Sequence, residues 1–120
     1  MGNASQSSLW RMVSQADGLS EWFADEVFMD VPETTYTFVW RKMSDEAIVV
    51  SKKPYSSIRF QWADEDDEQI FFEFIIHKQD LTGKMSLEIV DFVEPDEKDG
   101  AIALWESQVE KMKKRLGVFV

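Results

Sequence analysis

The sequence has 120 residues, 44% of them hydrophobic, and a formal net charge of −10. This length fits one domain, which can bury roughly 65% of its unfolded surface in a single core. The strong negative charge argues against nucleic acid and anionic membrane surfaces as partners. Cysteine is absent, so no disulfide framework or thiolate chemistry is available. We therefore expect one folded domain over residues 1–120.

The start of the chain and its hydropathy bear on location. Met1–Ser8 has neither the basic segment nor the apolar segment of a signal peptide. No apolar run approaches the ~20 residues that a membrane helix needs. We expect a cytoplasmic protein with no nucleic acid and no membrane among its partners.

Two short helices are predicted at the beginning of the chain. Ser5 can cap a helix over Gln6–Ser14, which Asp17-Gly18 is expected to end. Ser20 can then cap a second short turn through Trp22-Phe23. Helices joined this closely are expected to pack as a V-shaped bracket.

Six strands follow, indicated by the alternation of apolar and polar residues. They are expected at Val27–Val31, Thr35–Arg41, Glu46–Lys52, Ser57–Trp62, Gln69–Lys78 and Lys84–Phe92. The predicted connections are Met43–Asp45, Lys53–Ser56, Ala63–Glu68 and Asp80–Gly83. Loops this short join antiparallel neighbours. The alternation places aromatic side chains on one face of the sheet and polar side chains on the other.

The last stretch, Glu97–Leu116, is predicted to be a long one-sided helix. Its apolar residues recur every three or four positions, at Ile102, Trp105, Val109, Met112 and Leu116. An acidic group at its start, within Glu94–Asp99, complements the helix dipole. A stripe of this kind needs a large apolar partner, so the helix and the aromatic face of the sheet are expected to form one core.

The block Gly18–Val27, GLSEWFADEV, resembles a signature of the START-like superfamily. Within it, the block looks like the branch related to the C-terminal domain of the activator of Hsp90 ATPase. Phe60-Gln61-Trp62 is similar to an F-x-W strand of that branch, and Trp105 stands where its C-terminal helix carries a tryptophan. The resemblance covers Ser5–Gly117.

The resemblance implies an α+β helix-grip fold in a single START-like domain. In such a fold, a curved antiparallel sheet of about six strands wraps around a long C-terminal helix, and two short N-terminal helices close one end. Family members usually begin with a further strand, for which only Met1–Ala4 remains here. An exposed sheet edge accepts added strands, so we predict that the chain forms a homodimer, or swaps an element with a second copy, along that edge.

Catalytic machinery is sparse in this sequence. His77 is the single histidine and is expected on the polar face, where an imidazole is poorly placed as a general base. The acidic run Asp64–Glu68 lacks the glycine and glutamate spacing of a calcium loop and is expected to be a solvated hairpin tip. No catalytic residue, metal ligand or cofactor is predicted. An enzyme, like the cyclases and hydratases of the wider superfamily, ranks last among the candidate functions.

The aromatic face leaves a packed core and a ligand cavity as alternatives. In related proteins the space between sheet and helix is often a cavity for apolar small molecules. The residues that would line it are Trp22, Phe23, Tyr36, Phe38, Trp40, Phe60, Trp62, Phe72, Phe74, Met85, Leu87, Trp105, Val109 and Met112. Tyr36 and Ser51 are among the few polar side chains expected to face inward. The resemblance favours a non-catalytic module that binds a small hydrophobic molecule; the alternative is a protein-interaction or co-chaperone-like module.

Overall fold

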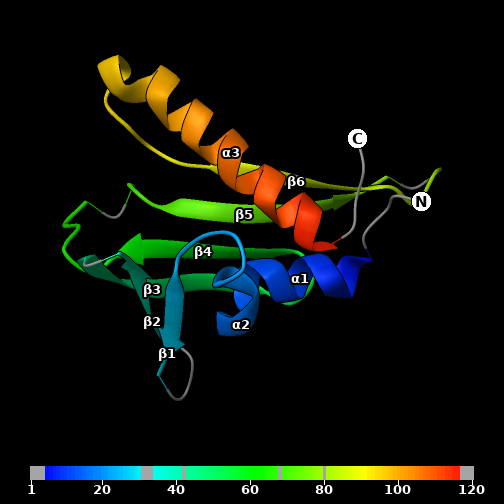
Figure 1. Cartoon of the computed structure of the whole chain (residues 1–120), viewed down its shortest axis with the longest axis horizontal. Helices are drawn as coiled ribbons and strands as arrows, with labels where there is room; N and C mark the ends of the chain where they lie inside the picture. Colours follow the sequence, from blue (N-terminus) through cyan, green and yellow to red (C-terminus); the bar gives the residue numbers. More distant parts are fainter. Residues whose placement is uncertain (1–4, 31–33, 42, 68, 80, 117–120) are drawn as a thin grey trace.

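Six antiparallel strands form one sheet in chain order, and a long helix crosses one face of it (Figure 1). A computed structural model describes residues 5–30, 34–41, 43–67, 69–79 and 81–116. The helices are α1 (Gln6–Ser14), α2 (Ala16–Leu19) and α3 (Lys98–Leu116), with a 3₁₀ turn η1 (Pro95–Glu97) before α3. The strands are β1 (Glu26–Met29), β2 (Thr35–Trp40), β3 (Met43–Lys53), β4 (Ser57–Trp62), β5 (Phe72–Lys78) and β6 (Met85–Val90). The predicted α+β helix-grip architecture is confirmed.

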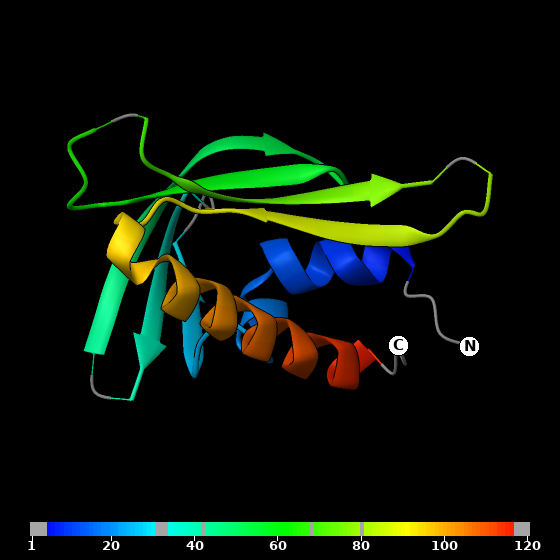
Figure 2. The ribbon, with the colours of Figure 1, turned by 90° about the horizontal axis from the view of Figure 1, so that it is seen from above.

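The three helices lie on the same side of the curved sheet, as the view from above shows (Figure 2). The sheet bends toward them at β1, β2 and β3, while β5 and β6 run above α1 and α3 in this view. Each strand pairs with its neighbour in sequence, from β1 at one edge to β6 at the other. This arrangement leaves one inner face, which the helices cover, and one outer face.

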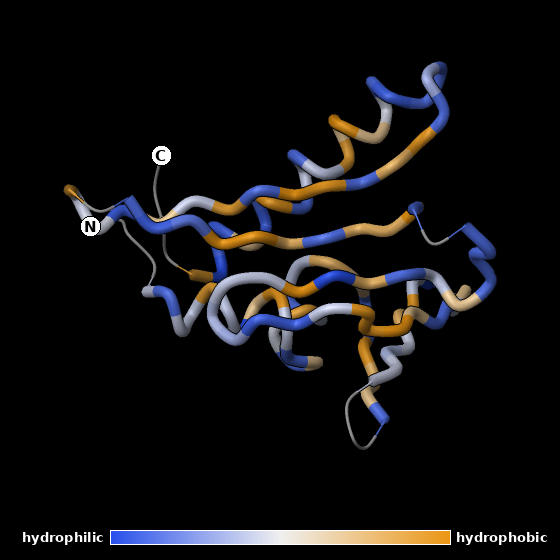
Figure 3. Tube along the Cα trace, turned by 180° about the vertical axis from the view of Figure 1, so that it is seen from behind, coloured by the Kyte–Doolittle hydropathy of each residue, from blue (hydrophilic) through white to orange (hydrophobic). Residues whose placement is uncertain are grey.

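The core consists mainly of aromatic side chains from alternate strand positions. Tyr36, Phe38, Phe60, Phe72 and Phe74 are all at most 1% exposed. Their rings pack tightly against one another; the rings of Phe60 and Phe72, for example, stack with centroids 5.0 Å apart. Hydrophobic segments run along the strands, and hydrophilic ones mark the start of α3 (Figure 3). The predicted aromatic inner face is therefore confirmed.

The beginning of the chain differs in part from its prediction. The backbone N–H of Ser8 donates to Ser5 Oγ at 3.1 Å, so the predicted cap of α1 is confirmed. Asp17 and Gly18 lie inside α2, and the prediction that they end the first helix was wrong. A Cβ atom at Gly18 would lie 2.1 Å from the carbonyl oxygen of Arg11. Glycine is present there because the two helices approach each other closely.

The predicted cap of the second turn also has another role. Ser20 follows α2, and its hydroxyl donates to the carbonyl oxygen of Asp17 at 2.8 Å. It therefore ends a helix rather than starting one. Trp22 and Phe23 lie in the turn that follows.

Two strand boundaries differ from the sequence expectation. β3 begins at Met43, so the predicted connection Met43–Asp45 was wrong. The chain reverses earlier because Arg41 adopts a positive φ of 54° and its N–H donates to Asp25 Oδ2 at 2.6 Å. β5 begins at Phe72 rather than at the predicted Gln69. The predicted positions Val31, Glu68, Asp80 and Gly117 lie outside the described residues.

A β-bulge in β3 changes which residues face inward. Val49 pairs with Phe60, but the next pair is Ser51 with Arg59, because the register shifts between Val49 and Ser51. Paired residues share a face of the sheet, so Ser51 lies with Arg59 on the outer face. The expectation that Ser51 faces inward was wrong. Arg59 donates to Glu73 Oε1 at 3.1 Å, on the outer face as predicted.

Candidate functional site

Helix α3 contacts the rest of the domain along a narrow line. Met112 is its one buried residue. Trp105 and Val109 are partly buried against the core, whereas Ile102 and Leu104 are 46% and 61% exposed. The helix therefore leaves open space along both of its flanks.

Trp105 occupies the middle of this line of contact. Its ring stacks on Phe23 with centroids 5.6 Å apart and meets the edge of Phe74 at 5.9 Å. Its indole Nε1–H donates to Asp91 Oδ2 at 3.1 Å. One turn further along α3, Gln108 Nε2–H donates to the carbonyl oxygen of Phe23 at 3.0 Å. Packed rings thus fill the space directly beneath the middle of the helix.

One flank of α3 holds a groove of about 860 Å³, which we call the wide groove. It lies between α3, the turn after α2 and the beginning of β3. Its buried lining residues include Trp22 and Phe23, and Trp40 is partly exposed beside them. Met43 and Leu104 line it from β3 and α3 and are 71% and 61% exposed. The wide groove therefore combines an aromatic floor with an apolar rim.

The polar groups of the wide groove are mostly engaged in fixing its shape. The carbonyl oxygen of Phe23 accepts from Trp40 Nε1–H at 2.8 Å as well as from Gln108. The Asp25 carboxylate accepts from the backbone N–H of Arg41. The charged lining residues are Glu21, Asp25, Arg41 and Lys111. Two acids and two bases give these lining residues no net charge.

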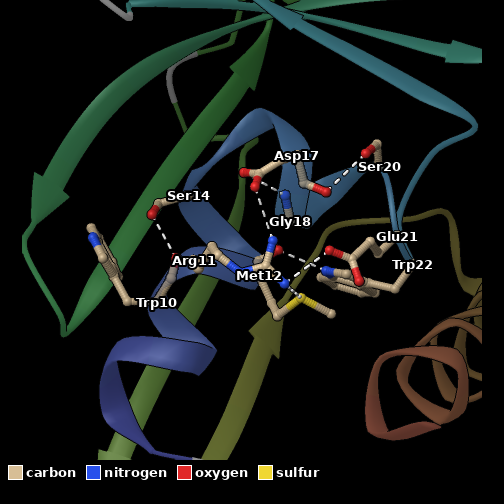
Figure 4. A network of polar contacts seen from close by, with 9 residues as sticks. All are labelled: Trp10, Arg11, Met12, Ser14, Asp17, Gly18, Ser20, Glu21 and Trp22. Carbon is tan, nitrogen blue, oxygen red and sulfur yellow. Dashed lines mark hydrogen bonds and ion pairs between the residues drawn. The ribbon is translucent and has the colours of Figure 1, made fainter. Parts of the chain in front are cut away.

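A network of polar contacts holds the turn that carries Trp22 and Phe23 (Figure 4). Arg11 Nη1 lies 3.0 Å from Asp17 Oδ2, and Nη2 lies 2.8 Å from Glu21 Oε2. The hydrogen bond with Glu21 is the main cause of a raised pKa of Arg11. Trp22 Nε1–H donates to the carbonyl oxygen of Met12 at 2.7 Å. Because Glu21 and Trp22 both contact α1, these contacts position the turn that forms the floor of the wide groove.

The other flank of α3 holds a smaller groove of about 390 Å³ beside β6, which we call the edge groove. Leu87 and Ile89 line it from β6, and Ile102, Trp105 and Val109 line it from α3. Glu106, Glu110 and Lys113 complete its lining. Like the wide groove, it is apolar with charged groups around it.

The residues predicted to line a cavity fall into three sets. Trp22, Phe23 and Trp40 line the wide groove, and Leu87, Trp105 and Val109 line the edge groove. The remaining residues pack within or against the core, namely Tyr36, Phe38, Phe60, Trp62, Phe72, Phe74, Met85 and Met112. The Tyr36 hydroxyl donates to the carbonyl oxygen of Ser14.

Of the residues that line the wide groove, only Trp22, Phe23 and Trp40 were predicted; those not predicted include Met43, Leu104 and Gln108. Met43 was assigned to a connection, and Leu104 and Gln108 lie outside the apolar stripe of α3. Leu104 offered a signal, because it is a large apolar residue on the otherwise polar flank of that helix.

Other sequence features lie away from both grooves. His77 is exposed on the outer face, where its Nε2 lies 2.7 Å from Glu88 Oε1. In the acidic run, the backbone N–H of Asp67 donates to Glu65 Oε2 at 3.1 Å, so a carboxylate stabilises the turn. Within the described ranges, no three His, Asp or Glu side chains gather into a metal-binding group. No helix in the described part has both the length and the apolar surface needed to cross a membrane.

The sheet order, the helix layer and the position of α3 define a helix-grip domain. The START-like superfamily domain matches residues 2–118, and the chain belongs to this superfamily. Protein BfR322 from Bacteroides fragilis, solved by solution NMR, is 41% identical. The match covers 97% of this chain and 84% of that protein, with a TM-score of 0.65.

More distant structures share the fold. The Aha1 dimer from Colwellia psychrerythraea is 15% identical with a TM-score of 0.75, over 96% of this chain and 90% of that one. Protein MLL2253 from Mesorhizobium loti is 18% identical with a TM-score of 0.70, over 95% and 90%. At these identities the likeness shows the fold alone. No curated protein matches the sequence.

Proposed function

We propose that the protein binds a small hydrophobic molecule in the wide groove and does not transform it. The observation that carries this proposal is a groove of about 860 Å³ with an aromatic floor and two exposed apolar residues at its rim. Small-molecule sites typically have volumes of about 300–1,000 Å³ and mainly apolar walls. Domains of the START-like superfamily commonly bind hydrophobic molecules, which supports the same function.

The chemistry of the groove indicates what kind of molecule would fit. An apolar body that covers Trp40, Met43 and Leu104 would remove their exposed surface from water, which gains about 25 cal/mol per Å². Ser107 and Lys111 lie on the α3 side of the groove and could hold one polar end of the molecule. An amphipathic molecule with a largely apolar body therefore fits the groove best.

The carboxylates of the wide groove support binding rather than catalysis. Glu21 is paired with Arg11, and Asp25 accepts the backbone N–H of Arg41. Histidine is absent from the lining residues that the structure describes. The carboxylates that could act as general bases are thus engaged in other contacts, and we propose a carrier or sensor role. The acidic, cysteine-free chain suits the cytoplasm, where we propose that it acts.

A matched pair of variants on α3 tests this proposal. Leu104→Glu places a carboxylate in the wide groove, and Ile102→Glu places one in the edge groove. Both positions are exposed, so both variants should fold. Binding is measured by the fluorescence of 1-anilinonaphthalene-8-sulfonate and its displacement by fatty acids, sterols and aromatic metabolites.

The two variants should give different results. We expect Leu104→Glu to weaken binding at least about tenfold, because an apolar ligand would have to desolvate the carboxylate. Ile102→Glu should bind like the wild type. The proposal would be contradicted if the wild type bound none of these compounds. It would also be contradicted if binding were lost in Ile102→Glu but kept in Leu104→Glu.

A protein-interaction module is the second candidate function, and a separate observation favours it. β6 forms an edge of the sheet, where another strand could pair with it. The Colwellia neighbour is described as a dimer, which supports testing whether this chain also associates.

A further inference from the structure

β6 is the longer of the two edge strands of the sheet. It has six residues, against four in β1, and no strand within the described ranges pairs with its outer side. In Figure 1, β6 lies at the upper edge of the sheet and the beginning of α3 rises away from it. Unpaired N–H and C=O groups on such an edge are a template for another strand.

The inner-face residues of β6 are complementary to themselves. When two copies of this strand pair antiparallel around a two-fold axis perpendicular to the sheet, each residue stays on its own face. With Leu87 opposite Leu87, Met85 of each copy lies opposite Ile89 of the other. All three are partly buried hydrophobic residues packed against the core. Pairing of this kind would cover apolar surface on both copies.

The outer-face residues fit in the same register. Ser86 lies opposite Glu88 of the second copy, so a hydroxyl donor meets a carboxylate acceptor. Lys84 lies opposite the uncharged Val90, so no like charges meet at this position. Each of these contacts occurs twice because of the symmetry.

The neighbouring symmetric register that is centred on Glu88 is disfavoured by charge. A shift that centres the pair on Glu88 places this carboxylate directly opposite its own copy. Like charges in directly opposite positions destabilise a strand pair. Charge therefore favours the register centred on Leu87 over the one centred on Glu88.

We propose that two copies of this chain associate by antiparallel pairing of their β6 strands, with Leu87 opposite Leu87. The two sheets then form one continuous sheet with all helices on the same side. The edge groove, lined by Leu87 and Ile89, borders the new contact. This proposal is independent of ligand binding in the wide groove on the other flank of α3.

The charge of the whole chain sets a condition on this association. Each copy carries a formal net charge of −10, so the two copies repel each other at long range. Salt screens this repulsion, with a Debye length of about 10 Å at 0.1 M. Association should therefore be tighter at 0.5 M NaCl than at 20 mM NaCl.

Two substitutions at one exposed position test the register. Ser86→Glu places a carboxylate opposite Glu88 at two places in the dimer, whereas Ser86→Lys creates two opposite-charge pairs. Sedimentation equilibrium over a range of concentrations measures the dissociation constant. Ser86→Glu should weaken the dimer by about five- to thirtyfold, and Ser86→Lys should strengthen it.

A control on the other edge separates this dimer from alternatives. Phe28 in β1 is 56% exposed, so Phe28→Gln, which keeps the net charge, should leave the dissociation constant unchanged. Circular dichroism and the unfolding midpoint verify that each variant is folded. A wild type that stays monomeric up to about 1 mM would overturn the proposal, as would a dimer that both Ser86 variants leave unchanged. In a monomer, the alternate β6 amides that point away from β5 should exchange freely. Their protection would identify another occupant of the edge and would also overturn the proposal.

Discussion

The rings of Phe23 and Trp105 stack nearly parallel, with centroids 5.6 Å apart and planes 12° apart. Phe23 belongs to the turn after α2, and Trp105 belongs to α3. This contact therefore joins the N-terminal helices to the C-terminal helix. The wide groove and the edge groove lie on either side of the stack, with Phe23 lining the first and Trp105 lining the second.

Trp105→Ala should lower the free energy of unfolding by roughly 2–4 kcal/mol. The substitution removes the stack with Phe23 and the hydrogen bond to Asp91. The value lies below that for a fully buried tryptophan because Trp105 is partly exposed. Urea unfolding followed by circular dichroism measures the change, and Leu104→Ala is the control. A loss below about 1 kcal/mol would show that the stack does not hold α3 in place.

Gly18→Ala should destabilise the domain by about 2 kcal/mol or more, although alanine is the better helix former. The added Cβ would lie 2.1 Å from the backbone carbonyl oxygen of Arg11, so α1 and α2 would have to move apart. Gly100 in α3 provides the matched control, since nothing lies within 4 Å of a Cβ atom there. Gly100→Ala should stabilise by about 0.5–1 kcal/mol. Thermal unfolding of both variants checks this, and shifts of the same sign would contradict the account.

Tyr36→Phe tests the link between β2 and α1. The Tyr36 hydroxyl donates to the carbonyl oxygen of Ser14, and both residues are fully buried. The variant takes this donor away from a buried carbonyl, which should cost about 1–2 kcal/mol of unfolding free energy. Tyr55 is 51% exposed, so Tyr55→Phe should stay within about 0.5 kcal/mol of the wild type. Equal effects of the two substitutions in urea unfolding would rule out a stabilising role for this hydrogen bond.

The elements that alternate clearly could be predicted from the sequence. Ser57–Trp62 was predicted with the bounds it has in the structure. Its alternation reflects one buried and one solvated face, which is a local property of the strand. The same holds for α1, where Ser5 supplies the predicted side-chain cap.

The features that depend on contacts between distant segments could not be predicted. The turn at Arg41 depends on a hydrogen bond to Asp25, and the inclusion of Gly18 in a helix depends on its approach to Arg11. Periodicity gave the direction of the stripe on α3 but not the distance between this helix and the sheet. The place of Met43 and Leu104 on the wide groove depends on how α3 packs on the rings beneath Trp105.

The most direct test of ligand binding is the methyl NMR spectrum of ¹³C-methionine-labelled protein during titration with 1-anilinonaphthalene-8-sulfonate. Met43 lines the wide groove, whereas Met85 lies in β6 and Met112 is buried under α3. We expect the Met43 methyl signal to shift progressively until saturation, with the Met85 and Met112 signals nearly unchanged. A Met43 signal that stays in place while the compound binds would contradict the assignment of the wide groove as the ligand site.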